Sequence, residues 1–325
     1  MDLTDMNRRL PQAMTLGALC VLLPCIGWAD ATKPATGRAP TATGRSTACQ
    51  PVLVKIDRPE KVGRTSQISI QSSNREVTET RNAAAQPELK RIYEAGSLRG
   101  VREVLAVGKN GRATKLKLAI ESLKFTAAEN VEPKELLAGG KVVVAELKNG
   151  QVAFTVDGKP ATAALDLALQ SFGLIYEGPE TDVLFNTKVP HAIGDTWSVN
   201  LPEVVKQDIY QSLTFDLKAS SGKVTLGQIA KVDGIDCYML TCEMTLIPSG
   251  MVGQDGANVA GSAVKFATTT PVPVDPNLPE VGCKTDDETT FKIRFKAADG
   301  TNSVINVTTK AIRDEKLQDR VPAGK

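Results

Sequence analysis

The stretch Pro59-Glu-Lys-Val62-Gly63-Arg-Thr65 and the later stretch Pro190-His-Ala-Ile193-Gly194-Asp-Thr196 share the pattern P-x-x-[VI]-G-x-T. Each leads into alternating residues typical of β-strands. Each is also followed by a two-residue turn signal, Asn110-Gly111 in the first case and Asp233-Gly234 in the second. Because the order of these features is the same, the sequence predicts two related β modules, at about residues 59–124 and 190–247. The alternative is a chance resemblance between two short stretches.

Hairpin signals recur along the whole chain. Asn-Gly or Asp-Gly dipeptides stand at 110–111, 149–150, 157–158, 233–234 and 299–300, and such dipeptides favour the type I′ turns that join antiparallel strands. We expect hairpins around residues 110, 149, 233 and 299, because alternating runs flank these four. In one such run, Leu116, Leu118 and Ile120 alternate with polar residues, which predicts a sheet with one apolar face and one solvated face.

Three segments begin with proline and end with glycine, as helices often do. They are residues 87–96, 133–139 and 160–173. The third segment is the most apolar, with Leu165, Leu169 and Phe172 on one face, so we expect it to lie against the inner face of the sheet. A sheet of about ten to twelve strands tends to curl. The predicted fold is therefore mainly β, a strongly curved antiparallel half-barrel or open barrel, with two or three short helices capping or plugging it.

The N-terminus has the pattern of a secretory signal peptide. Arg8 and Arg9 precede an apolar run over residues 13–28, and small residues follow. The run is shorter than the roughly 20 residues that a membrane span requires, and it contains Pro24. We expect cleavage after Ala29 or Ala31, no transmembrane segment after cleavage, and a periplasmic or extracellular location. The expected organisation is a signal peptide at 1–29, a flexible leader at 30–50, a single β-rich domain at 51–315 and a polar tail at 316–325.

These features give residues 55–313 a resemblance to known proteins. The signal peptide, the order of hairpins, the plugging helix and the strand entry Gly194-Asp195-Thr196-Trp197 resemble exported bacterial β-rich families of unknown function. More distantly, the expected curved sheet is similar to the half-barrel of periplasmic lipoprotein carriers. The resemblance is architectural, and it assigns no functional residue.

The composition argues against a nucleic-acid partner. The chain has 39 Lys and Arg against 37 Asp and Glu, and only 4% of its residues are aromatic. Binding to nucleic acid requires a clustered basic face, and binding to single strands adds aromatic side chains that stack on bases. We therefore expect a different class of partner.

Four cysteines follow the signal peptide, namely Cys49, Cys237, Cys242 and Cys283. Cys237 and Cys242 lie on one expected strand, roughly 16 Å apart at the rise of a β-strand, which is too far for a disulfide. We expect Cys242 to be a buried thiol and regard Cys49, Cys237 and Cys283 as disulfide candidates. No Cys-x-x-Cys pair is present and His191 is the only histidine, so we expect neither a metal site nor a cofactor.

His191 is also the one histidine that catalysis could use. A triad with Asp182 or Asp195 and a nearby serine is arithmetically possible, but no nucleophile motif such as G-x-S-x-G accompanies it. The acidic stretches 286–288 and 233–236 are weak signals for hydrolysis or calcium binding. We expect no catalytic residue and place His191 on a turn.

Residues 248–283 are rich in glycine, proline and small apolar residues. They contain either one strand, around 259–268, within a long loop, or an apolar lid. We hypothesise that this segment and the 160–173 helix flank an apolar cavity, although a lone tryptophan such as Trp197 also often anchors a core. The candidate ligand-binding residues are Leu165, Leu169, Phe172, Trp197, Met251, Val252 and Phe266.

The function that this interpretation favours is that of an exported, non-enzymatic envelope protein. Its partner would be an apolar small molecule of lipid or lipoprotein type, or another envelope protein. A structural or assembly factor without a ligand cavity is the first alternative, and a secreted hydrolase is the second.

Overall fold

A computed structural model describes residues 50–82, 86–175, 180–207, 213–252, 258–296 and 302–319. The predicted signal peptide, Cys49 and most of the predicted tail lie outside these residues. Strands account for 61% of the described residues, which confirms a mainly β fold. The elements are β1 (Thr65–Asn82), β2 (Glu88–Val107), β3 (Ala113–Thr126), β4 (Lys134–Leu137), β5 (Val142–Lys148), β6 (Gln151–Val156), β7 (Lys159–Pro160), α2 (Ala163–Gln170), α3 (Thr181–Leu184), β8 (Thr196–Ser198), α4 (Leu201–Val204), β9 (Leu213–Phe215), β10 (Ser221–Val232), β11 (Ile235–Leu246), β12 (Pro248–Met251), β13 (Ala263–Pro273), β14 (Gly282–Lys296) and β15 (Asn302–Asp319).

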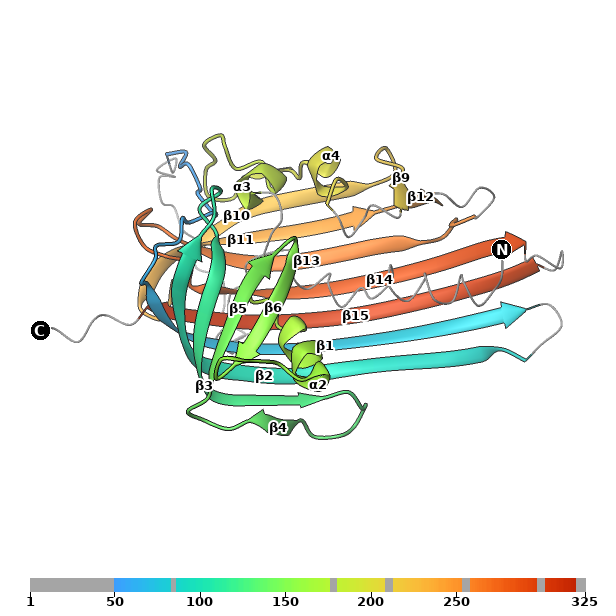
Figure 1. Ribbon diagram of the computed structural model, residues 1–325. Helices are drawn as coiled ribbons and strands as arrows, with labels where there is room; N and C mark the ends of the chain where they lie inside the picture. The colour runs from blue at the N-terminus through green and yellow to red at the C-terminus, as the bar shows by residue number, and fades with distance from the viewer. Residues whose placement is uncertain are drawn as a thin grey trace, which may run out of the picture.

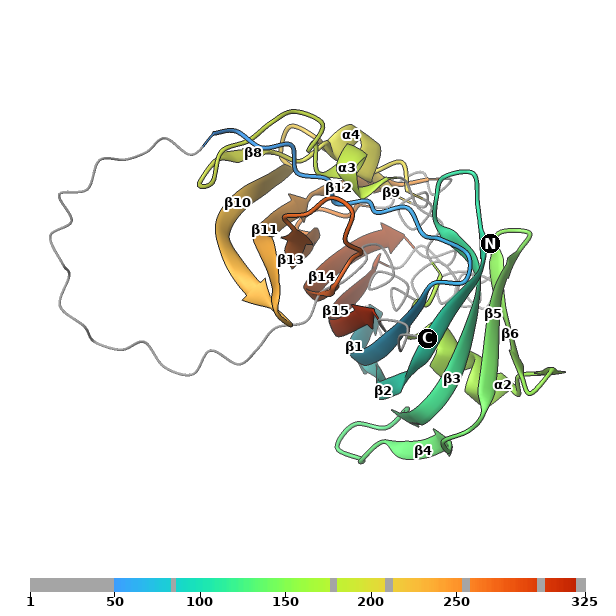
Figure 2. The same ribbon diagram turned by 90° about the vertical axis from the view of Figure 1, so that its left-hand side faces the viewer.

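Thirteen of these strands form one antiparallel sheet. Its order is β7-β6-β5-β3-β2-β1-β15-β14-β13-β11-β10-β8, with β4 paired to β3, while β9 and β12 form a separate two-stranded sheet. The large sheet curves strongly and stays open, because its end strands β7 and β8 do not pair with each other (Figures 1 and 2). This confirms the predicted half-barrel. At its centre, the first strand β1 pairs with the last strand β15, from Ser66 opposite Asp319 to Asn82 opposite Ser303.

The two P-x-x-[VI]-G-x-T segments have the same backbone arrangement. Gly63 and Gly194 have φ angles of 84° and 94°, in the left-handed region that favours glycine. The N–H of Gly63 donates to the carbonyl of Val104 at 2.8 Å, and the N–H of Gly194 donates to the carbonyl of Leu226 at 2.7 Å. After the first segment, β1 pairs with β2, which continues through a hairpin into β3. After the second segment, β8 pairs with β10, which continues through a hairpin into β11. The two segments thus have corresponding neighbours, although β8 is short and lies at the sheet edge.

The predicted hairpins are present. Those around 110, 149 and 233 join β2 to β3, β5 to β6 and β10 to β11. In the last two, φ is positive at both turn residues, as a type I′ turn requires. Strands β14 and β15 pair from Lys296 opposite Asn302, so they form the fourth hairpin, whose turn lies outside the described residues.

One of the three predicted helices is confirmed. Residues 160–173 contain α2, whereas 87–96 and 133–139 are not helical and fall mainly in strands β2 and β4, so those two predictions are wrong. Strand β2 pairs along most of its length with both β1 and β3, and this long-range pairing overrides a local pattern that favours helix. Residues 248–283 contain β12 and β13 and enter β14, which agrees with the strand alternative for that segment.

The core has two main apolar clusters. Helix α2 packs on the first, the α2 cluster, and α3 and α4 contribute to the second, the α3–α4 cluster. The buried members of the α2 cluster are Ile68, Ile70, Leu98, Val104, Leu116, Leu118, Ile120, Leu123, Val143, Ala145, Phe154, Leu169, Phe172 and Ile175. Those of the α3–α4 cluster are Val54, Ile56, Leu184, Phe185, Val199, Val204, Val224, Leu226, Leu240, Cys242, Met244, Leu246, Val259, Val264, Phe266, Val272, Phe291, Ile293, Ile305 and Val307.

Residues 50–64, which we call the strap, cross the open side of the half-barrel (Figure 2). Near one end, Val52 exchanges two backbone hydrogen bonds with His191, at 2.8 and 2.9 Å. Farther along, the N–H of Glu60 donates to the carbonyl of Gly111 at 2.8 Å, in the turn between β2 and β3. The strap therefore links segments from the two halves of the sheet.

Candidate functional site

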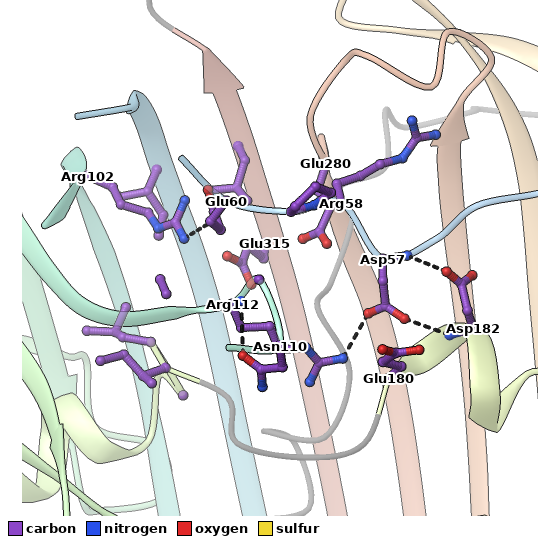
Figure 3. Close-up of a pocket in the computed structure, with 18 of the residues that line it drawn as sticks. Asp57, Arg58, Glu60, Arg102, Asn110, Arg112, Glu180, Asp182, Glu280 and Glu315 are labelled. Atoms are coloured by element: carbon purple, nitrogen blue, oxygen red, sulfur yellow. Dashed lines mark hydrogen bonds and ion pairs between the residues drawn. The ribbon is translucent and has the colours of Figure 1, made fainter. Parts of the chain in front are cut away.

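The described residues line a cavity of about 380 Å³ beside the strap (Figure 3). Its lining comes from the strap, Ile68 on β1, Arg102 on β2, the β2–β3 turn, residues 173–175 after α2, the start of α3, Glu280 before β14, and the end of β15. Part of the lining is apolar, from Ile68, Leu174, Ile175 and Leu317, and much of the rest is charged. The volume lies within the range of small-molecule sites, roughly 300–1,000 Å³.

Three arginines of the cavity are paired with carboxylates. The Arg112 Nη2 atom lies 2.8 Å from Asp57 Oδ1, Arg313 Nη2 lies 2.6 Å from Glu315 Oε2, and Arg102 forms an ion pair with Glu60. Because Arg102, Arg313 and Glu315 are at most 8% exposed, two of these pairs are largely shielded from water. Removing one partner of such a pair would leave an uncompensated buried charge.

A fourth arginine, Arg58, is held by backbone carbonyls. Its Nη2 and Nη1 groups donate to the carbonyl oxygens of Pro273 at 2.8 Å and Asp275 at 3.2 Å. Burial lowers the pKa of Arg58, and the carboxylates of Glu280, Asp182 and Asp275 oppose that shift. The strap is thereby tied to the end of β13.

Glu280 differs from the other cavity acids. Within the described part of the chain its carboxyl group forms no hydrogen bond or ion pair, and no dashed line reaches it in Figure 3. Burial raises the pKa of Glu280 to about 8, the carboxylates of Glu60 and Asp57 act in the same direction, and Arg102 opposes them. The side chain is partly exposed, but it lines the cavity, where a charge is less well hydrated than in bulk water. The raised pKa favours the protonated form at neutral pH.

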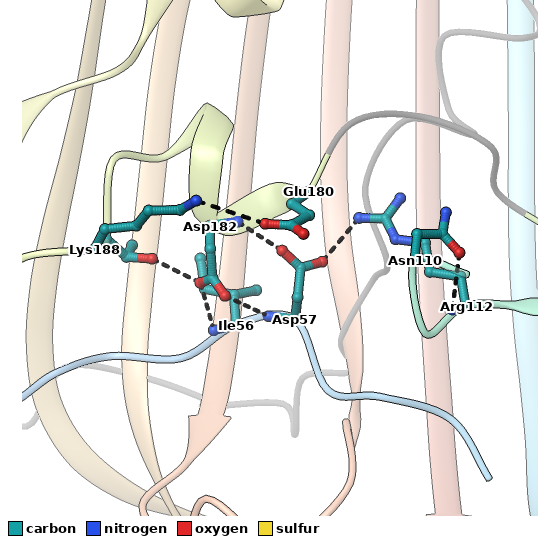
Figure 4. A network of polar contacts seen from close by, with 8 residues as sticks. Ile56, Asp57, Asn110, Arg112, Glu180, Asp182 and Lys188 are labelled. Atoms are coloured by element: carbon teal, nitrogen blue, oxygen red, sulfur yellow. Dashed lines mark hydrogen bonds and ion pairs between the residues drawn. The ribbon is translucent and has the colours of Figure 1, made fainter. Parts of the chain in front are cut away.

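A reciprocal hydrogen-bonded contact joins the strap to α3 (Figure 4). The N–H of Asp182 donates to Asp57 Oδ2 at 2.7 Å, and the N–H of Asp57 donates to Asp182 Oδ2 at 3.3 Å. Asp182 Oδ1 also accepts from the N–H of Ile56 at 2.8 Å and from the hydroxyl of Thr187 at 2.6 Å. Burial raises the pKa of Asp182, and the hydrogen bonds from Thr187 and Ile56 oppose this shift. The contact fixes one side of the cavity.

A second polar spot lies on the buried face of β1, β15 and β14. Asp287 and Asn74 both stand opposite Ala311 in the strand register, and they are 2% and 8% exposed. Within the described residues, both carboxyl oxygens of Asp287 and the Oδ1 atom of Asn74 have no hydrogen-bond partner. Burial raises the pKa of Asp287 well above its usual range, and Asp286 adds to the effect. This site therefore favours a neutral carboxylic acid.

None of the seven predicted ligand-binding residues lines the cavity. The α2 cluster includes Leu169 and Phe172, and Leu165 packs on it. The α3–α4 cluster includes Phe266, and Trp197 and Met251 pack on it. Val252 is 58% exposed. The predicted 160–173 and 248–283 segments do reach the cavity, through Gly173, which lies after the end of α2, and through Glu280.

Trp197 and His191 have a structural arrangement. Their rings stack with centroids 3.5 Å apart, and the Trp197 Nε1–H donates to the carbonyl of Phe185 at 2.6 Å. His191 is 8% exposed; it forms a β-bridge with Val52 and directly precedes the turn that leads into β8. The ring is buried because it covers the indole, and Trp197 packs against the α3–α4 cluster.

The three described cysteines are buried. Cys237 and Cys283 share a small cluster with Val281, but Cys237 carries a free thiol, so these two are not joined. Burial raises the pKa of Cys237 to about 11 and that of Cys242 to about 12. Cys49, the third disulfide candidate, lies outside the described residues.

Two further classes of site are absent from the described ranges. No group of three or more His, Cys, Asp or Glu residues there is arranged to hold a metal ion. No described helix is long and apolar enough to cross a membrane.

The charged cavity was not predicted from the sequence, although the sequence contains a signal for it. Arg102 follows Leu98 and Gly100 at alternate positions and precedes Val104, and all four are buried on one face of β2. Arg313 and Glu315 continue the alternate buried positions of β15 in the same way. A charged residue in the register of an apolar face indicates a buried ion pair or a polar site.

No known family profile matches this chain, and no curated protein sequence matches it. Among solved structures, a lipovitellin structure described by its lipid–protein interactions has a TM-score of 0.33 and 11% identity, over 82% of this chain and 26% of that one. A DUF1329 family protein from Desulfovibrio piger has a TM-score of 0.16 and 12% identity, over 80% and 88% of the two chains. DynF from the dynemicin biosynthesis pathway of Micromonospora chersina has a TM-score of 0.15 and 9% identity, over 88% and 95%. This chain thus spans about a quarter of the lipovitellin chain, and these weak similarities assign it to no family.

Proposed function

We propose that this is an exported, non-enzymatic binding protein that holds a small amphipathic molecule in the cavity beside the strap. The observation that supports this proposal is the mixed lining of the 380 Å³ cavity, in which four leucine and isoleucine side chains accompany the charged residues. Small-molecule sites are typically concave and apolar with a few placed polar groups. An apolar chain would lie against Ile68, Leu174, Ile175 and Leu317, and a polar group would lie among the charged residues.

The other parts of the proposal rest on sequence. The Arg8-Arg9 and apolar pattern at the N-terminus supports export to the periplasm or the cell exterior. A non-enzymatic role is supported by the setting of His191, whose ring is stacked on Trp197 and lines no part of the cavity. A cavity of this size favours ligand binding over a structural factor with a sealed core.

A titration with N-phenyl-1-naphthylamine, an apolar dye that fluoresces out of water, tests the proposal on the full chain. We expect saturable binding with one dye molecule per chain. Leu317→Gln should weaken it by up to about tenfold, because full burial of a leucine contributes about 1.5–3 kcal/mol, Leu317 is partly buried, and 1.4 kcal/mol is a factor of ten. Leu53→Gln is the matched control, since Leu53 is 62% exposed and outside the cavity. Absence of saturable binding, or equal effects of the two variants, would refute the proposal.

A further inference from the structure

The charges of the cavity are almost all engaged by the protein itself. Arg102, Arg112 and Arg313 each pair with a carboxylate, and Arg58 donates to two carbonyl groups. An anionic ligand would have to compete with one of these contacts. The other basic residue of the lining is Lys55, whose side chain is exposed.

Glu280 is the cavity carboxyl group that the described chain leaves without a partner. The charged groups that face it come from three elements. They are Asp57, Arg58 and Glu60 on the strap, Arg102 on β2 and Glu315 on β15. Three of these five are carboxylates, so an added positive charge would interact favourably with Glu280 and with its surroundings.

We propose that Glu280 binds the ammonium group of the ligand, which makes the ligand class an amphipathic amine. The inference rests on the proposed function and specifies its polar end. The ammonium group supplies hydrogen-bond donors that the Glu280 carboxylate lacks, while the hydrocarbon part of the amine occupies the apolar lining around Leu174, Ile175 and Leu317.

Binding of an ammonium group to Glu280 is linked to the release of a proton. Glu280 is mainly protonated below pH 8, so binding of an ammonium group displaces that proton into solvent. The affinity for an amine should therefore rise with pH, by up to about tenfold per pH unit between pH 6 and pH 8. It should fall again near pH 10.4, where an alkylammonium group itself loses its proton.

Three ten-carbon competitors test the inference on the full chain at pH 7.5, namely decylamine, decanol and decanoate, each displacing N-phenyl-1-naphthylamine. We expect decylamine to displace the dye at a concentration at least about tenfold lower than the other two, as a charge-assisted contact provides. Glu280→Gln should remove that preference and leave decanol unchanged. Glu288→Gln, on the exposed face of β14, should keep the preference.

The two proposals fail in different ways. If decanol or decanoate displaces the dye as well as decylamine does, the amine inference is overturned and the amphipathic cavity stands. If Glu288→Gln matches Glu280→Gln, the amine inference is also overturned. If none of the three compounds displaces bound dye, the amine inference is overturned, whereas absence of saturable dye binding would refute the binding function itself.

Discussion

Replacing Glu280 with glutamine should change how the stability of this protein depends on pH. In the folded chain the pKa of Glu280 is about 8, against an ordinary value of 4.5. Because the folded state binds this proton more tightly than the unfolded state, its contribution to stability is fully present below pH 4.5. That contribution is lost as the pH rises toward 8. Glutamine is neutral at every pH and removes this dependence.

The magnitude follows from the interval between pH 5 and the folded pKa. At 1.36 kcal/mol per pH unit, the wild type should lose roughly 4 kcal/mol relative to Glu280→Gln between pH 5 and pH 8.5. Other buried acids, such as Asp182 and Asp287, titrate equally in both proteins, so the difference between the two proteins isolates Glu280.

Urea unfolding followed by circular dichroism at the two pH values measures this difference. The two proteins should have similar unfolding free energies at pH 5, and the variant should be the more stable at pH 8.5. Glu288→Gln serves as the control, because Glu288 is exposed, and it should follow the wild type. If the unfolding free energies of the wild type and Glu280→Gln differ by the same amount at pH 5 and pH 8.5, the raised pKa of Glu280 is refuted.

Three further predictions concern the supports of the fold and are measured by thermal or urea unfolding. Leu169→Glu should destabilise the chain by roughly 3–5 kcal/mol, because it places an unpaired charge in the α2 cluster. Leu167→Glu on the same helix, 47% exposed, should cost at most about 0.5 kcal/mol, and equal losses would contradict the packing of α2. Asp57→Ala should cost about 1–3 kcal/mol, because it removes the carboxylate that accepts from the N–H of Asp182 and pairs with Arg112; an unchanged unfolding midpoint would show that this contact contributes nothing. Gly96→Ala should cost about 1–3 kcal/mol, because the new Cβ would lie 2.7 Å from a carbonyl oxygen of β3; a neutral result would mean that β2 and β3 shift apart freely.

The sequence predicted those parts of the fold that local residues determine. The Asn149-Gly150 and Asp233-Gly234 turns require only two residues with positive φ, so each hairpin could be located from its own dipeptide. The apolar face of α2 is equally local. Residues 88–96 were misassigned because their strand conformation depends on pairing with β1 and β3, which a local window does not contain.

The cavity was beyond the reach of such local reasoning. The contact between Asp57 and Asp182 joins residues 125 positions apart, and that between Arg313 and the carbonyl of Phe172 joins residues 141 positions apart. Asp57, Asp182 and Phe172 are ordinary in their own segments. Arg102 on β2 and Arg313 on β15 do indicate from the sequence that charge is buried there, because each stands in the register of a buried face.

The pairing of β1 with β15 has a consequence for the order of assembly. The central seam of the sheet joins residues near position 66 to residues near position 319, so it cannot form until almost the whole chain has been synthesised. Closing a loop of this length costs conformational entropy before the contacts between β1 and β15 can stabilise the chain. Such long-range pairing makes folding slow.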